Sequence, residues 1–189
     1  FITVAVNVAA EDAKIVIVGG WGGTAQQMEF LKKEIPGSIV VMDNVATSLI
    51  PTGDVSEQVK ILEAKIKVLG IERAIFVAHS YGGLVVREFA RKYPEAVEKI
   101  ILIGTPNGGY KNWSFGKGSI IDRDIPVYVV AGNKSAKKWY LADDSNDGTV
   151  DVSSIYSIPI SGDARMFQLD HVELIHSKEV TSQINAWLE

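Results

Sequence analysis

The sequence contains no cysteine among its 189 residues. Disulfide bonds, a cysteine nucleophile and zinc sites built from thiolates are therefore excluded. It also lacks any continuous apolar run of the roughly 18 to 20 residues that span a bilayer, so we expect a soluble chain without a transmembrane segment. The compartment stays open, because the lack of cysteine alone does not assign one.

A large excess of one charge is missing as well. The chain has 19 Lys and Arg residues against 23 Asp and Glu residues, which gives a formal net charge of -4 and a pI near 5.4. No basic run is long enough to neutralise a series of phosphates, so we expect no nucleic-acid partner. The hydrophobic content of 47% and the length together predict a single domain over residues 1–189.

The chain begins at Phe1 rather than at methionine, and its first residues are apolar. β-Branched residues occupy every second position there (Ile2, Val4, Val6 and Val8). This is the period of a half-buried strand, and we favour it over the alternative, the remnant of a signal peptide. Whether a precursor segment precedes Phe1 is left open.

Apolar runs alternate with segments of helical period along the rest of the chain. The apolar runs predict strands at residues 14–18, 38–42, 74–78, 99–103, 127–131 and 166–169. Helical spacing predicts helices between Thr24 and Pro36, over 56–69, over 84–93 and around 180–188. Continuous apolar strands alternating with helices indicate an α/β fold with a mostly parallel sheet covered on both faces.

The glycine-rich turn VGGWGGTA at residues 18–25 has three interpretations. Gly20, Gly22 and Ala25 fit the GxGxxG/A pattern of dinucleotide sites, and Asp43 stands where an acidic ribose ligand is expected. Alternatively, the backbone N–H groups of the turn face a reaction centre and stabilise an oxyanion. In the third interpretation the glycines serve only the turn itself. The turn alone does not decide among them.

The stretch VAHSYGG at residues 77–83 follows an apolar strand and leads into a predicted helix. This is the context of a nucleophile elbow, a sharp turn that projects a serine hydroxyl from the end of a sheet. We expect Ala78 and Gly82 to be small because the turn brings the positions on either side of the serine close together. The resulting AxSxG motif predicts Ser80 as a nucleophile.

A serine hydroxyl becomes a good nucleophile when a base accepts its proton. His79 is adjacent to Ser80, but neighbouring side chains diverge in a sharp turn, so we expect His79 to pack or hydrogen-bond beside the site. His171 follows the last predicted strand and is the favoured base. His176 is the alternative, and Ser177 after it is a candidate cap for the last helix.

The base needs an acid to orient it, and sites built on such an elbow follow the chain order Ser, Asp or Glu, His. Asp147, in the acidic segment 143–154, satisfies this order and is the favoured acid. The same segment imitates the start of a calcium-binding loop (Asp143, Ser145, Asp147 and Gly148), but Ser154 stands where a bidentate Glu is expected. A solvated acidic turn is the third interpretation.

These motifs together resemble the α/β-hydrolase superfamily, and within it small bacterial lipases and esterases that also use an AxSxG elbow. The resemblance rests on VGGWGG, AHSYGGLVVREFARKYPEAVEKIILIGTPNGG, NDGTV and HVEL. It implies a catalytic Ser80, Asp147 and His171. It also implies an oxyanion hole formed by the backbone N–H groups of Trp21 and Tyr81.

One position departs from the pattern of these lipases. They often have His-Gly in the oxyanion loop, where this chain has Gly19 and Gly20. The stretch from residue 105 to residue 126 is too short for a large helical cap, so we expect an open site. Its aromatic residues are candidates for lining an acyl groove or, equally, for covering the core (Tyr110, Trp113 and Phe115).

The resemblance implies a serine hydrolase that cleaves carboxylic esters without a cofactor or metal, acting on a small-molecule ester or lipid. Two other functions stay open from the sequence. One is a dinucleotide-dependent oxidoreductase that uses Gly20 and Asp43. The other is a catalytically silent, hydrolase-like binding protein. The acyl chain, the leaving group and the oligomeric state are not predicted.

Overall fold

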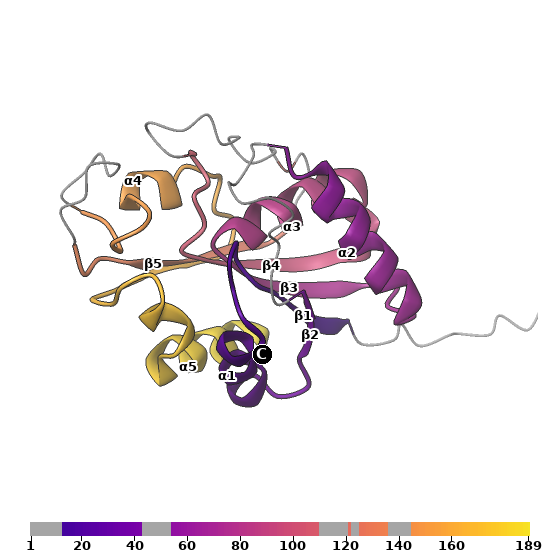
Figure 1. Ribbon diagram of the computed structural model, residues 1–189, viewed down its shortest axis with the longest axis horizontal. Coiled ribbons are helices and arrows are strands. Elements are labelled where there is room, and N and C mark those ends of the chain that lie inside the picture. Colours follow the sequence, from indigo (N-terminus) through magenta and orange to yellow (C-terminus); the bar gives the residue numbers. More distant parts are fainter. Residues whose placement is uncertain (1–12, 43–53, 110–120, 122–124, 136–144) are drawn as a thin grey trace, which may run out of the picture.

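A computed structural model describes residues 13–42, 54–109, 121, 125–135 and 145–189 (Figure 1). Its strands are β1 (Lys14–Val18), β2 (Ile39–Met42), β3 (Ala74–His79), β4 (Val97–Ile103), β5 (Val127–Gly132) and β6 (Ala164–Phe167). Its helices are α1 (Ala25–Glu34), α2 (Ser56–Val68), α3 (Tyr81–Lys92), α4 (Val152–Ile155) and α5 (Lys178–Leu188). Two 3-10 turns, η1 (Pro94–Ala96) and η2 (Glu173–Ile175), complete the described elements.

The six strands form one sheet in the order β2-β1-β3-β4-β5-β6, and every neighbouring pair is parallel. The predicted α/β class and the parallel sheet are therefore confirmed. In such a sheet all carboxyl ends lie at one edge, where ligands gather. None of the described connections between strands forms a large cap.

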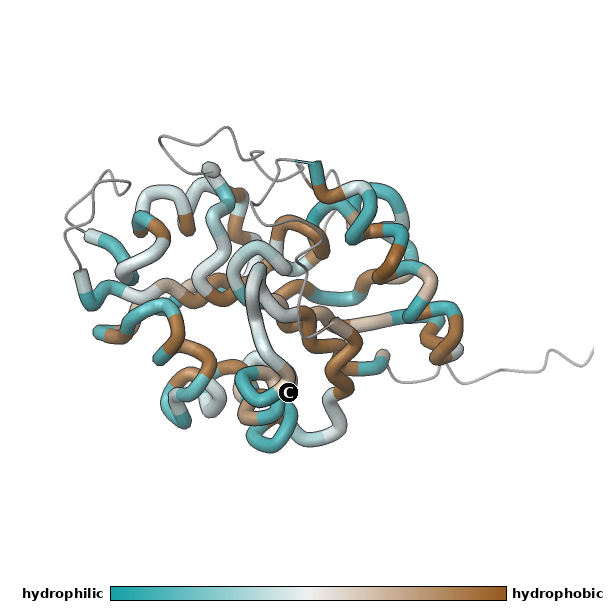
Figure 2. Tube along the Cα trace, viewed as in Figure 1, coloured by the Kyte–Doolittle hydropathy of each residue, from teal (hydrophilic) through white to brown (hydrophobic). Residues whose placement is uncertain are grey.

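Each strand sends alternate side chains to opposite faces of the sheet. In β1, Val16 and Val18 belong to one buried cluster, with α2 and α3, while Ile17 belongs to the other, with α1 and α5. The two helical layers lie above and below the sheet in Figure 1, and hydrophobic residues concentrate along its strands in Figure 2. Burial on both faces explains the continuous apolar runs of inner strands such as β3, whereas the edge strand β6 keeps exposed residues.

The helix boundaries follow from capping residues. Thr24 and Gln27 form a reciprocal capping box at the start of α1, and the Ser177 side chain accepts from the Val180 N–H at the start of α5. Both helix starts were expected at these residues. α3 begins at Tyr81, next to the start near Gly82 expected from the serine turn and before the start at residue 84 expected from helical spacing, because the helix follows directly from that turn.

Other predictions are shifted, missed or untested. β6 begins at Ala164, two residues before the predicted start, and the four-residue helix α4 was not predicted. The predicted strand at residues 1–8 lies outside the described residues, and the prediction of one domain over 1–189 stays a prediction.

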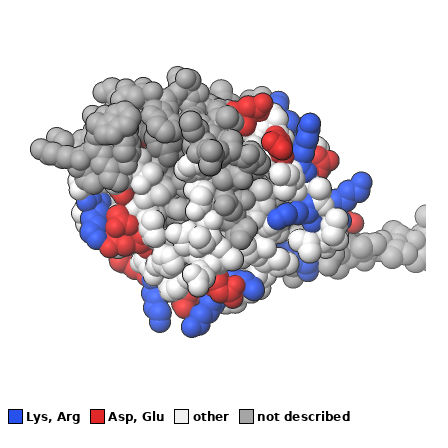
Figure 3. All heavy atoms as spheres, viewed as in Figure 1, with Lys and Arg blue, Asp and Glu red and all other residues white. Residues whose placement is uncertain are grey.

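Two expectations from the sequence, on transmembrane segments and on charge, can be compared with the described part of the chain. No helix there is both long and apolar enough to cross a bilayer. On the face drawn in Figure 3, Lys and Arg side chains are interspersed with Asp and Glu side chains around the margin. The described residues of this face therefore present no extended field of one sign.

Candidate active site

Ser80 occupies a sharp turn between β3 and α3. Its backbone has φ 53° and ψ -129°, a positive-φ conformation that a non-glycine residue rarely adopts. The turn is held by hydrogen bonds from the Ser80 N–H to the Ile103 carbonyl, at 2.8 Å, and from the Gly83 N–H to the Ser80 carbonyl, at 3.0 Å. The described geometry therefore matches the strained strand–turn–helix context that the sequence predicts.

Gly82 is required by a close approach between α3 and the end of β1. A Cβ added at this position would lie 2.2 Å from the carbonyl oxygen of Gly19 and 2.9 Å from that of Val18. Small size was expected because of crowding against Ala78, but the nearest atoms belong to the neighbouring strand and its glycine loop. The elbow and that loop are therefore packed backbone to backbone.

Replacing Gly82 with alanine is expected to destabilise the protein by about 3 kcal/mol, because neither carbonyl can move without shifting the sheet. Urea unfolding of Gly82→Ala measures the change in the free energy of unfolding. Gly37→Ala is the control, because Gly37 has φ +75° with nothing within 4 Å of an added Cβ. It is expected to cost only about 1 kcal/mol. A Gly82→Ala protein as stable as this control would contradict the packing account.

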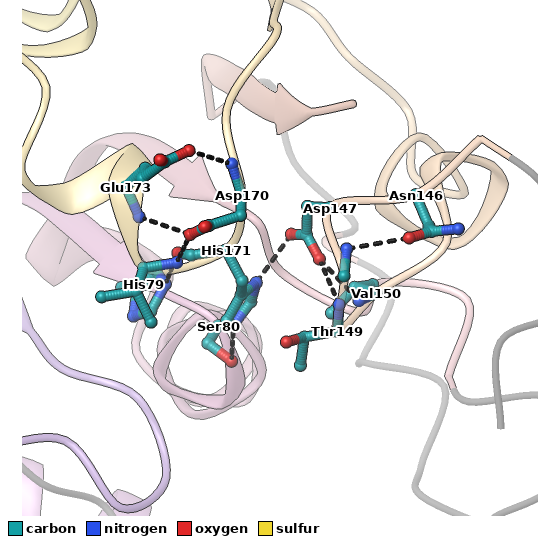
Figure 4. Close-up of polar contacts among 11 residues, drawn as sticks. His79, Ser80, Asn146, Asp147, Thr149, Val150, Asp170, His171 and Glu173 are labelled. Carbon is teal, nitrogen blue, oxygen red and sulfur yellow. Dashed lines mark hydrogen bonds and ion pairs between the residues drawn. The ribbon is translucent and has the colours of Figure 1, made fainter. Parts of the chain in front are cut away.

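Ser80, His171 and Asp147 are joined by hydrogen bonds at the carboxyl edge of the sheet (Figure 4). His171 Nε2 lies 2.8 Å from Ser80 Oγ, and His171 Nδ1 lies 2.6 Å from Asp147 Oδ2. All three residues are buried, and Asp147 is fully so. The structure thus brings together the serine, histidine and aspartate that the sequence singled out, over separations of 91 and 24 residues.

Asp147 is held by hydrogen bonds to both its side chain and its backbone. Its Oδ1 accepts from the N–H groups of Thr149 and Val150, at 2.9 and 2.7 Å. Its carbonyl oxygen accepts from the His171 N–H at 2.8 Å, so backbone and side chain both bind the histidine. Because Oδ1 is occupied by two backbone donors, Oδ2 is the oxygen left to face the imidazole.

Two glycines at strand ends make room for this pair, and sequence reasoning missed them. A Cβ added at Gly104, after β4, would lie 3.1 Å from both Asp147 Oδ2 and His171 Nδ1. One added at Gly132, at the end of β5, would lie 2.5 Å from the carbonyl oxygen of Leu169 and 2.8 Å from Asp147 Cβ. Glycine directly after a strand, in IGTP and VAG, is the sequence signal that marks them.

The other two histidines occupy different places. His79 Nε2 hydrogen-bonds to the carbonyl oxygen of His171 at 3.1 Å, so this ring hydrogen-bonds beside the site, as expected from the turn. His176 is exposed, and its ring packs against Phe30 with centroids 5.6 Å apart. Of the three histidines, His171 is the one that the structure places against Ser80.

Comparison with known proteins identifies the fold family of the chain. A family model described as alpha/beta hydrolase fold matches residues 42–135, which include the elbow, the helix after it and the strands on either side. The mature form of Bacillus licheniformis lipase BlEst2 is similar in structure, with a TM-score of 0.67 and 19% identity over 93% of this chain and 91% of that one. The chain belongs to the α/β-hydrolase superfamily.

Two further proteins are similar to this chain, one in structure and one in sequence. Naproxen esterase from Bacillus subtilis is similar over 95% of this chain and 85% of its own, with 12% identity and a TM-score of 0.62. Epoxide hydrolase 1 from Caenorhabditis elegans is 46% identical over 55 residues, or 26% of this chain. The chain spans only 10% to 22% of the length of the curated relatives it matches.

The glycine-rich loop of this α/β-hydrolase lies directly against the elbow. A Cβ added at Gly20 would lie 2.9 Å from Ser80 Cβ and 3.2 Å from His79 Nδ1. The chain then turns, with the Gly23 N–H donating to the Gly20 carbonyl at 3.3 Å and Gly22 at φ 69°. Trp21 therefore belongs to a turn that passes the serine, and Tyr81 is the first residue of α3.

Several residues to which the sequence analysis gives a candidate role lie outside the described residues. They are Asp43, the acid of the dinucleotide interpretation, Asp143 of the calcium interpretation, and the candidate groove residues Tyr110, Trp113 and Phe115. In the described part, the calcium interpretation lacks support. The Asp147 carboxylate is hydrogen-bonded to His171 and to backbone donors. Ser154 Oγ donates to the Gly109 carbonyl. Among the residues described, no cluster of metal ligands is found.

Proposed function

We propose that the protein is a serine hydrolase that cleaves carboxylic esters through an acyl-enzyme on Ser80. The observation that carries this proposal is the unbroken chain of hydrogen bonds from Ser80 Oγ through His171 to Asp147, with distances of 2.8 and 2.6 Å. This arrangement activates a serine hydroxyl, and the three groups have no other evident need to be buried together.

The first half-reaction follows from the atoms in place. Ser80 Oγ attacks the acyl carbon while its proton passes to Nε2 of His171, and the hydrogen bond to Asp147 stabilises the imidazolium that forms. Collapse of the tetrahedral intermediate breaks the bond to the alkoxy oxygen, which leaves as the alcohol with the proton from Nε2. The acyl group is then an ester of Ser80.

The second half-reaction uses the same groups with water in place of the alcohol. His171 takes a proton from water, and the hydroxide attacks the acyl carbon. The carboxylic acid leaves, and Ser80 Oγ regains its proton from Nε2. His171 therefore acts in turn as base and acid, while Asp147 keeps the Nδ1 proton in place throughout.

The oxyanion of each tetrahedral intermediate requires donors close to Ser80. We assign this role to the backbone N–H groups of Trp21 and Tyr81, as the resemblance implies. Two observations support the assignment: Tyr81 opens α3, whose positive N-terminal end lies at the serine, and the loop containing Trp21 packs on Ser80 through Gly20. Removal of one such donor typically costs about 100- to 1,000-fold in rate.

The position of the glycine loop favours this function over dinucleotide binding. Gly20 packs on Ser80 and on the ring of His79, so the loop faces the serine site that a hydrolase requires. The lipase and the esterase among the similar structures agree with an ester substrate. We therefore propose a small-molecule ester or lipid as the substrate and a mechanism that uses no cofactor.

Pre-steady-state hydrolysis of p-nitrophenyl butyrate tests this proposal. An acyl-enzyme predicts a burst of p-nitrophenol of about one equivalent per protein, followed by a slower steady rate. Calorimetry with NAD and NADP on the same sample is the parallel measurement, and no binding heat is expected. Cofactor binding together with absent ester hydrolysis would favour the oxidoreductase interpretation instead.

A further inference from the structure

His79 touches both loops that meet at Ser80. It is the last residue of β3, is buried, and precedes Ser80 in the chain. Its Nε2 lies 3.1 Å from the carbonyl oxygen of His171, and the two imidazole rings pack with centroids 4.6 Å apart at an interplanar angle of 41°. Its Nδ1 faces the position that a Cβ of Gly20 would occupy, at 3.2 Å.

The partner of Nε2 determines where the proton of His79 lies. A carbonyl oxygen only accepts hydrogen bonds, so Nε2 carries the proton and Nδ1 carries the lone pair. Burial, followed by the nearby His171 and to a lesser extent His176, lowers the pKa of His79 well below 6.5. The ring is therefore neutral near pH 7, and its one N–H is committed to His171.

The hydrogen bond from His79 connects the loop of the base His171 to β3, the strand that leads into Ser80. The His171 main chain is held on its N–H side by the Asp147 carbonyl and on its C=O side by His79. Because His79 and Ser80 are consecutive, the bond from His79 links the loop of His171 directly to the elbow. We propose that His79 is a positioning residue, which keeps Nε2 of His171 within proton-transfer distance of Ser80 Oγ.

The inference rests on the proposed function, since it assigns His79 a role through the general base. His79 itself neither accepts the serine proton nor contacts the acyl group in this account. A neutral ring also suits the place beside His171, because a cation there would oppose the imidazolium that forms during acyl transfer.

Two substitutions separate the hydrogen bond from the packing. His79→Phe keeps a flat ring against His171 but removes the donor, and we expect kcat to fall about 10- to 100-fold with KM unchanged. His79→Gln places an amide N–H near the position of Nε2, and we expect it to restore kcat to within about threefold of wild type. Rates are expressed per active site titrated with a fluorophosphonate, so loss of folded protein does not count.

His176→Phe is the matched control, because His176 is exposed and packs on Phe30 away from the serine. We expect its kcat to equal that of wild type. A His79→Phe protein with wild-type kcat, measured while Ser80→Ala is inactive, would overturn the positioning role and leave the nucleophile intact. Equal loss in His79→Phe and His79→Gln would also overturn it, since returning an N–H donor to this position would then restore no activity. An active Ser80→Ala would instead remove the proposed function itself.

Imidazole NMR of the wild-type protein tests the same point without a variant. We expect His79 to show its single N–H at Nε2 and no titration between about pH 6 and pH 8. A proton on Nδ1 in place of Nε2 would overturn the proposal, because Nε2 could then not donate to the His171 carbonyl. A ring that becomes charged in this range would also overturn it, because a cation would then lie beside the imidazolium that His171 forms.

Discussion

Replacing Ser80 with alanine is expected to lower kcat for p-nitrophenyl butyrate by about a millionfold, to the level left by binding and oxyanion stabilisation alone. The change removes the only atom of the side chain that attacks the acyl carbon. It leaves the backbone turn and its hydrogen bonds to Ile103 and Gly83 in place, so the melting temperature should move by no more than a few degrees.

Ser154→Ala is the matched control for that substitution. Ser154 is as buried as Ser80, at 8% exposure, and its hydroxyl also makes a hydrogen bond, to the Gly109 carbonyl at 2.6 Å. We expect it to cost some stability and to change kcat by less than about threefold. If Ser80→Ala kept a tenth or more of wild-type kcat, Ser80 would not be the nucleophile.

Replacing Asp147 with asparagine is expected to lower kcat about 10⁴-fold with the fold retained. The two backbone donors, Thr149 and Val150, require an oxygen at the Oδ1 position, so the new amide group is directed toward the imidazole. It would donate to Nδ1 of His171 and force the proton onto Nε2. In that tautomer Nε2 cannot accept the proton of Ser80.

Asp170→Asn is the control for the loss of one negative charge near the histidine. Asp170 precedes His171, is partly exposed, and accepts from the N–H groups of Val172 and Glu173 through Oδ1, which asparagine can also do. We expect kcat within about threefold of wild type. Equal losses in Asp147→Asn and Asp170→Asn would show that general electrostatics, not orientation of His171, explains the effect.

The fold was predictable because its signals are local. Alternate residues in β1 enter different clusters, and the same burial on both faces gives the inner strands short apolar runs. Capping residues fixed the starts of α1 and α5 in the same way. The start of α3 was less predictable, since Gly82 and Gly83 resemble turn residues and enter the helix only because the elbow leads straight into it.

The candidate site was predictable where one stretch of chain determines the geometry. The AxSxG turn places Ser80 through sequence-local sterics, and His171 follows from its place after the last strand. The choice of Asp147 among several acids relied on chain order and resemblance, because the acidic segment itself also fits a calcium loop or a solvated turn. Local sequence does not show which carboxylate meets the imidazole.

The remaining features depend on contacts between distant segments. Gly82 is small because of the carbonyl groups of Val18 and Gly19, and Gly104 because of the His171–Asp147 pair. The partner of His79 is 92 residues away in sequence. A glycine at a strand end can be seen in the sequence, but the atoms that it approaches cannot, because these contacts arise only when the strand ends meet at one edge of the sheet.

Covalent labelling of the wild-type protein with a fluorophosphonate tests the central claim most directly, because the reagent reacts with a serine that has been activated as a nucleophile. Intact mass and peptide mapping would report the number of adducts and the residue that carries them. The account predicts one adduct per chain, on Ser80, absent in Ser80→Ala and strongly slowed in Asp147→Asn. No adduct, or an adduct on another residue while Ser80 stays unmodified, would contradict it.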